Sequence, residues 1–168
     1  KFVWICILFY FCAGTLLFGG DGNSFSCRAD GTFKVLMISD THFTAEADNA
    51  AHALIGKLIE MEKPDLLIVD GDCISGIKDN QTAQQVRASI ANVAYVPESK
   101  KIPWAIVFGN HDQEHAVKTG LTKKDVLAMY AAYPSNRNGI GKEGITGAGN
   151  THFLIWNSAR TQPVSCLW

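Results

Sequence analysis

The chain has 168 residues, of which 47% are hydrophobic and 18% are charged, and its formal net charge at pH 7 is −1. This composition is that of one globular domain and excludes a disordered or fibrous chain. The balance of 15 basic and 16 acidic residues leaves no excess of positive charge for a polyanion, so nucleic acid is not an expected partner.

An uncharged apolar segment opens the chain. Residues 2–18 (FVWICILFYFCAGTLLF) follow Lys1 and precede a polar, turn-rich stretch. This is the composition of a secretory leader, so we expect residues 1–26 to be a signal peptide or a signal anchor and residues 27–168 to form the domain. The expected location is outside the cell or in the lumen of the secretory pathway. Membrane attachment is the alternative, if the leader is retained.

Two features bear on that compartment. Three of the five cysteines follow the leader (Cys27, Cys73 and Cys166), and an odd number leaves one thiol free or paired between chains. Asn80 begins an N-x-T acceptor that we expect on a surface loop. A glycan at Asn80 and an unmodified side chain both stay open.

After residue 30, strand patterns alternate with helix patterns. In chain order, the sequence predicts a strand at 32–39, a helix at 47–63, a strand at 65–69, a helix at 81–96 interrupted by Pro97, a strand at 104–108, a helix at 122–133 with a Thr cap, a Gly-rich loop, a strand at 151–158 and a final apolar run. Strands that are apolar throughout are buried on both faces, which predicts an α/β fold with a parallel sheet and helices on both of its faces.

Three consecutive strands end in residues of metal-binding type. Asp40 and His42 follow the first, Asp72 follows the second, and Asn110 and His111 follow the third. Ligands of parallel sheets bind at the carboxyl ends of the strands, where these side chains meet. Carboxylate, amide and imidazole groups suit divalent ions, and two ions about 3.5–4 Å apart hold a phosphate and acidify a water. The pattern therefore predicts a two-metal hydrolytic site.

These residues stand in a pattern that resembles the calcineurin-like metallophosphoesterases. The family's D-x-H, G-D and G-N-H-D/E blocks match Asp40 to His42, Gly71-Asp72 and Gly109 to Asp112, in that order. The surrounding sequences look most like the compact purple acid phosphatase-like branch: TFKVLMISDTHF, EKPDLLIVDGDCISG and KIPWAIVFGNHDQE. The resemblance covers about residues 32–168 and implies a layered α/β sandwich, a sheet flanked by helices, in incomplete form.

The resemblance also implies the metal ligands. Asp40 and His42 would bind the first ion, Asp72 would bridge both ions, and Asn110 would bind the second. The tyrosine that colours true purple acid phosphatases is replaced here by Ser75. The two ions could therefore be iron, manganese or zinc, and no tyrosinate–iron absorption band is expected.

His111 and Asp112 complete the expected site. By the same resemblance, His111 stabilises the transition state or protonates the leaving oxygen, and Asp112 holds the imidazole in orientation. The family's later histidines have no counterpart up to residue 168, so we interpret the chain as the amino-terminal part of the domain. We expect a metal-dependent phosphoesterase that acts on a small phosphorylated substrate. A catalytically inactive, truncated secreted or anchored domain is the alternative.

The remaining candidate residues receive structural interpretations. His52 lies in a predicted helix and is expected to be a surface or packing residue, and Cys73 is expected to be a small buried thiol. His115 and His152 are within reach of the mouth of the site, but a lone histidine is usually structural or solvated. The G-x-G-x-x-G match at 139–144 follows a helix rather than a strand, which excludes a dinucleotide-binding turn.

Overall fold

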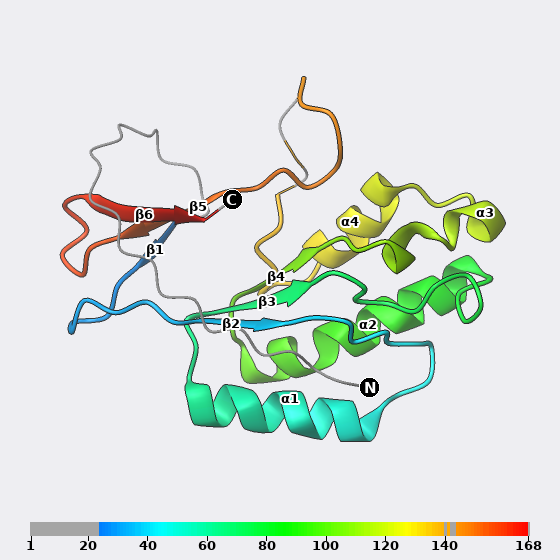
Figure 1. Cartoon of the computed structure of the whole chain (residues 1–168), viewed down its shortest axis with the longest axis horizontal. Helices are drawn as coiled ribbons and strands as arrows, with labels where there is room; N and C mark the ends of the chain where they lie inside the picture. Colours follow the sequence, from blue (N-terminus) through cyan, green and yellow to red (C-terminus); the bar gives the residue numbers. More distant parts are fainter. Residues whose placement is uncertain (1–23, 140, 142–143, 168) are drawn as a thin grey trace.

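The structure is a computed structural model and describes residues 24–139, 141 and 144–167 (Figure 1). Most of the predicted leader, residues 1–23, lies outside the described residues. Within them, we find no helix whose length and apolar character would let it cross a membrane.

The elements follow the alternation that the sequence predicts. Their order is β1 (Ser24–Ser26), β2 (Val35–Ile38), α1 (Asn49–Glu62), β3 (Leu66–Asp70), α2 (Ala83–Lys100), β4 (Trp104–Val107), a 3-10 helix η1 (His111–Gln113), α3 (Ala116–Thr119), α4 (Lys123–Ala131), β5 (Phe153–Trp156) and β6 (Pro163–Leu167). A capping box at Thr122 begins α4, as the Thr cap predicts. The predicted α/β class is confirmed.

The strands form two separate sheets (Figure 1). One is wholly parallel, in the order β2-β3-β4, and aligns Leu36 with Leu67 and Leu67 with Trp104. The other has the order β1-β5-β6, with β1 parallel and β6 antiparallel to β5. No strand is predicted at β1, because its residues fall within the segment 1–26 that is expected to be the leader, and a three-residue segment of Ser, Phe and Ser carries little periodic signal.

The two faces of the parallel sheet are covered by different layers. One face packs on α1, α2 and α4 in a cluster that includes Leu36, Ile38, Leu67, Val69, Trp104, Ile106, Ile55, Ile59, Ile90, Val93, Val126 and Leu127. On the other face, Leu66 and Ala105 form a cluster with Phe153 of the second sheet. Figure 1 shows α1 and the second sheet on opposite sides of the parallel sheet.

The prediction that helices cover both faces is therefore wrong for the described part of the chain. Continuous hydrophobicity in a strand reports that both of its faces are buried. It does not report whether the covering layer is made of helices or of strands.

Helix α2 continues beyond the point where the sequence predicts an interruption. It begins at a capping box on Thr82, includes Pro97 and ends at Lys100. Proline removes one helical hydrogen bond, but Val96 and Pro97 are buried, and the N–H of Ile102 donates to the Pro97 carbonyl at 3.0 Å. Packing of the last turn therefore outweighs the missing bond.

Asn80 does not lie on the surface, contrary to the prediction. Its side chain is 0% exposed. Its Nδ2 donates to the Ser75 carbonyl at 2.6 Å, and its Oδ1 accepts from the Ser89 hydroxyl at 2.7 Å. The N-x-T motif predicts a surface loop, whereas here the amide satisfies polar groups inside the fold.

The structure confirms that His52 is a packing residue and that Cys73 is a buried thiol, and it places His115 in the interior. His52 is a packing residue whose ring lies 5.0 Å from that of Phe43 and 4.8 Å from that of Tyr95. Cys73 is fully buried, and burial raises the pKa of its thiol well above the ordinary value. His115 is 1% exposed, so it is part of the interior.

Candidate metal centre

The loops after β2 and β3 are hydrogen-bonded to each other beyond the ends of the strands. The N–H of Asp40 donates to the Gly71 carbonyl at 3.1 Å, and the N–H of His42 donates to the Asp72 carbonyl at 2.9 Å. The Thr41 hydroxyl adds a bond of 2.8 Å to the Cys73 carbonyl. These bonds fix the two loops in register and bring their side chains to one edge of the sheet.

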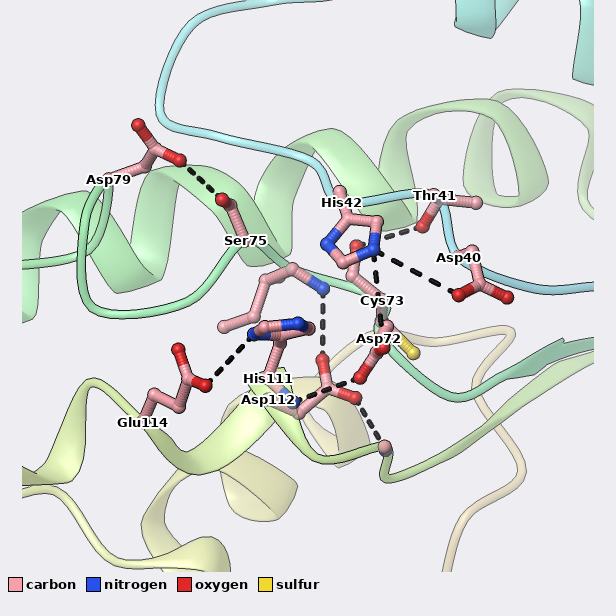
Figure 2. Close-up of polar contacts among 12 residues, drawn as sticks. Asp40, Thr41, His42, Asp72, Cys73, Ser75, Asp79, His111, Asp112 and Glu114 are labelled. Atoms are coloured by element: carbon pink, nitrogen blue, oxygen red, sulfur yellow. Dashed lines mark hydrogen bonds and ion pairs between the residues drawn. The ribbon is translucent and has the colours of Figure 1, made fainter. Parts of the chain in front are cut away.

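Three predicted ligands form a cluster at this edge (Figure 2). One ligand atom each from Asp40, His42 and Asp72 lies within 4.8 Å of the others. His42 Nε2 is 4.0 Å from Asp40 Oδ1 and 4.0 Å from Asp72 Oδ2. Metal ions bind such atoms at about 2.0–2.2 Å, so the donor set fits one ion after small side-chain adjustments.

The same three residues have backbone conformations that are rare outside glycine. Their φ angles are 56° for Asp40, 46° for His42 and 47° for Asp72. Residues with a side chain seldom adopt this left-handed region, and such positions concentrate at functional sites. The hydrogen bonds between the two loops hold these conformations in place.

The loop after β4 completes the edge by contacting Asp72. The N–H of His111 donates to Asp72 Oδ1 at 2.9 Å, which leaves Oδ2 facing His42. A Cβ at Gly109 would lie 2.2 Å from Asp72 Oδ1, so only glycine permits this approach. Asn110, which stands between Gly109 and His111 in the sequence, is exposed. The structure therefore brings all three predicted motif blocks together.

His111 lies beside the cluster and is contacted by a residue that the sequence analysis did not identify. Its ring centroid is 5.1 Å from that of His42, and its Nδ1 is 3.0 Å from Glu114 Oε1 (Figure 2). The hydrogen bond to Glu114 is the main cause that raises the pKa of His111, and the same bond lowers the pKa of Glu114. The available signal was the spacing, since residues three apart on a helical turn face each other.

Asp112 does not orient the His111 imidazole, contrary to the prediction. Its Oδ1 accepts the N–H of Ile74 at 2.9 Å, and its Oδ2 accepts the N–H of Gly109 at 2.7 Å. The side chain is buried, and this burial raises its pKa despite the two bonds. Asp112 therefore ties the loop after β4 to the loop after β3.

Fold and site together define an α/β protein with a candidate metal centre at the carboxyl edge of a parallel sheet. The chain belongs to the calcineurin-like phosphoesterase family, whose profile matches residues 33–162. The resemblance that the motif blocks indicate is thereby confirmed.

Curated relatives carry phosphatase names. "Probable inactive purple acid phosphatase 29" of Arabidopsis thaliana is 27% identical over 77% of this chain and 36% of its own length. "Phosphatase DCR2" of Saccharomyces cerevisiae is 26% identical over 83% of this chain and 26% of its own length. The chain thus spans about a quarter to a third of the length of these relatives.

One solved structure aligns with the chain. The nuclease MPE of Pseudomonas putida matches with a TM-score of 0.34 and 15% identity, covering 73% of this chain and 59% of that chain. A likeness at this level is too weak to support a shared activity.

Proposed function

We propose that this chain provides metal ligands and a catalytic histidine to a phosphoesterase site that hydrolyses phosphate esters. The observation that carries the proposal is the clustering of Asp40, His42 and Asp72 at the carboxyl edge of the parallel sheet. Membership of the calcineurin-like phosphoesterase family supports the same reaction class.

Each residue has a proposed part in holding the ions. Asp40, His42 and Asp72 would hold the first ion, and Asp72 and Asn110 would hold the second. The ions, iron, manganese or zinc, supply Lewis acidity and lower the pKa of a bound water when present. The N–H of His111 fixes the carboxylate plane of Asp72, so the oxygen that faces His42 is already oriented for an ion.

His111 acts on the substrate in this proposal. Its ring stands beside His42, where it can donate a hydrogen bond to a phosphate oxygen or a proton to the leaving oxygen. The expected substrate is a small phosphorylated compound.

A second candidate is an inactive domain that keeps the fold for binding. The names of two relatives, purple acid phosphatases 29 and 14 of Arabidopsis thaliana, describe those proteins as probably inactive. The two candidates differ in whether bound metal is accompanied by hydrolysis.

Metal content and hydrolysis test the proposal together. The purified chain is dialysed against iron, manganese or zinc, and bound metal is measured beside hydrolysis of p-nitrophenyl phosphate. We expect Asp72→Asn to lower metal affinity at least about tenfold, because even residues that only support a ligand contribute this much. Asp30→Asn is the matched control, since Asp30 is exposed and its carboxylate accepts from the N–H and the hydroxyl of Thr32. Equal metal in Asp72→Asn and the parent chain would contradict the site, and bound metal without hydrolysis would favour the inactive domain.

We also propose a secreted or lumenal location, with membrane anchoring as the alternative, on the composition of residues 2–18. Expression of the full coding sequence in cells, followed by fractionation and protease protection, checks this. A chain that stays in the cytosol would contradict it.

A further inference from the structure

Glu114 connects His111 to the loop that follows β3. Its Oε1 lies 3.0 Å from His111 Nδ1, and its Oε2 accepts the N–H of Ile77 at 3.3 Å. The two oxygens thus contact groups from two different loops, which restrains the carboxylate although its side chain is partly exposed.

Gly76 leaves the space that this carboxylate occupies. A Cβ at position 76 would lie 1.9 Å from Glu114 Oε2 and 3.0 Å from His111 Nδ1. Gly76 is not among the glycines with positive φ, so its backbone conformation does not require glycine. The structural reason for glycine here is room for the contact between Glu114 and His111.

Other acidic side chains near the ring are engaged elsewhere. Both oxygens of Asp112 accept backbone N–H groups. Asp79 accepts the Ser75 hydroxyl. Asp72 Oδ1 accepts the backbone N–H of His111 rather than a proton from its ring. Within the described part of the chain, Glu114 is therefore the carboxylate that contacts an imidazole nitrogen of His111.

This contact selects one state of the ring. An ionised carboxylate only accepts hydrogen bonds, so the nitrogen that faces it carries a proton. In a neutral histidine, the hydrogen bond made by one ring nitrogen decides whether that nitrogen or the other carries the proton. We propose that Glu114 is a positioning residue that holds His111 with its Nδ1–H toward the carboxylate and its Nε2 available to the phosphate ester. The protonated ring gives its Nε2 proton to the leaving oxygen and is left as the neutral Nδ1–H tautomer. The inference rests on the proposed function for the role of Nε2.

Two substitutions separate this role from simple packing. Glu114→Gln keeps the shape of the side chain but has one oxygen for two donors, Ile77 N–H and His111 Nδ1–H. Gly76→Ala displaces the Glu114 carboxylate, which can move because it is the end of a flexible side chain. Its Cβ would also lie 3.0 Å from His111 Nδ1, so this variant tests the contact together with Glu114→Gln rather than alone. Gly56→Ala is the control, since a Cβ there meets its nearest atom at 3.9 Å.

The first readout is the tautomer of His111, measured by long-range proton–nitrogen correlation on the nitrogen-15-labelled chain, at a pH where the ring is neutral. We expect the Nδ1–H form in the parent chain and in Gly56→Ala. We expect a mixture, or the Nε2–H form, in Glu114→Gln and Gly76→Ala, with unchanged far-ultraviolet circular dichroism. The same tautomer in all four chains would overturn the proposal, whatever their activity.

The second readout is hydrolysis by the metal-loaded chain. With an alkyl phosphate, whose leaving group needs a proton, we expect Gly76→Ala and Glu114→Gln to lower kcat about tenfold or more with little change in KM. With p-nitrophenyl phosphate the loss should be smaller. Equal losses on both substrates would overturn the role of Nε2. If the parent chain hydrolyses neither substrate, the proposed function fails, and the tautomer result still decides whether Glu114 positions the ring.

Discussion

Gly109 lies so close to Asp72 that a Cβ at position 109 would fall 2.2 Å from the carboxylate Oδ1 and 2.3 Å from the backbone nitrogen. These atoms belong to the loops after β4 and β3, whose main chains therefore come close together, in addition to the side-chain bonds that Asp72 and Asp112 make between the two loops. The nitrogen cannot move without moving the loop, so the fold depends on the absence of a side chain at this position.

Gly109→Ala is expected to destabilise the chain by at least about 2 kcal/mol, because overpacking against backbone is not relieved by a rotamer change. Urea denaturation measures the difference in the free energy of unfolding between Gly109→Ala and the parent chain. Gly56→Ala in helix α1 is the matched control and should raise stability by about 0.5–1 kcal/mol, since it has room for a methyl group and alanine favours helix. Equal stability of Gly109→Ala and the parent chain would show that the two loops do not meet as described.

Asp40→Gly is expected to stabilise the metal-free chain while weakening metal binding. Glycine removes the cost of a left-handed conformation, which is of the order of 1 kcal/mol per residue. Lys101→Gly is the control, because Lys101 is the C-cap that follows α2, has a φ of 52° and precedes β4, whereas the cluster follows the strands. Both variants should gain about 0.5–1 kcal/mol in urea denaturation, and only Asp40→Gly should lose metal affinity. A less stable Asp40→Gly would contradict the idea that the ligand positions are strained.

Asn80→Ala is expected to cost about 1–3 kcal/mol, because the Ser75 carbonyl loses its donor and the Ser89 hydroxyl loses one acceptor in the interior. Gln81→Ala, next to it and exposed, should change stability by less than about 0.5 kcal/mol. Both free energies of unfolding come from urea titrations. A tolerated Asn80→Ala would argue that Asn80 points to solvent and is open to a glycan.

His115 is expected to make stability depend on pH. Burial lowers its pKa, although Asp112 acts in the opposite direction. The unfolded chain then binds a proton more readily than the folded chain, so this contribution is complete above the ordinary pKa of about 6.5 and is lost as the pH falls through the folded pKa.

Replacing His115 by Gln removes this titration. Urea denaturation at about pH 7 and about pH 5 should show a smaller loss of stability on acidification in His115→Gln than in the parent chain. An unchanged difference between the two pH values would show that His115 stays solvated.

Strands and helices with a clear apolar pattern could be predicted from the sequence. Strand β1 and the last turn of α2 could not, because they depend on tertiary packing. Apolar runs identified β2, β3 and β4 because burial on both faces leaves few polar positions to blur the pattern. Strand β1 is too short for a pattern and exists through pairing with β5. Local rules predict an interruption at Pro97, but Val96 and Pro97 are buried in the last turn of α2, and this packing keeps the helix continuous.

The site was predictable to the extent that its residues directly follow strands. Asp40, His42 and Asp72 could be placed together because parallel strands end at a common edge. The carboxylate that contacts the His111 ring could not be predicted, since Asp112 and Glu114 are both acidic and near His111 in sequence. Only the three-dimensional path of the loop shows that Asp112 binds backbone groups and Glu114 the ring.

The hydrogen bonds that join the loops after β2 and β3 bear on how a metal would be chosen. The backbone N–H groups of Asp40 and His42 bond to the carbonyls of Gly71 and Asp72, so the two loops form one preorganised unit. An entering ion would then order little backbone, and little conformational entropy would oppose its binding. Selection among iron, manganese and zinc would fall to the softness and spacing of the side-chain donors rather than to the energy of folding a loop around the ion.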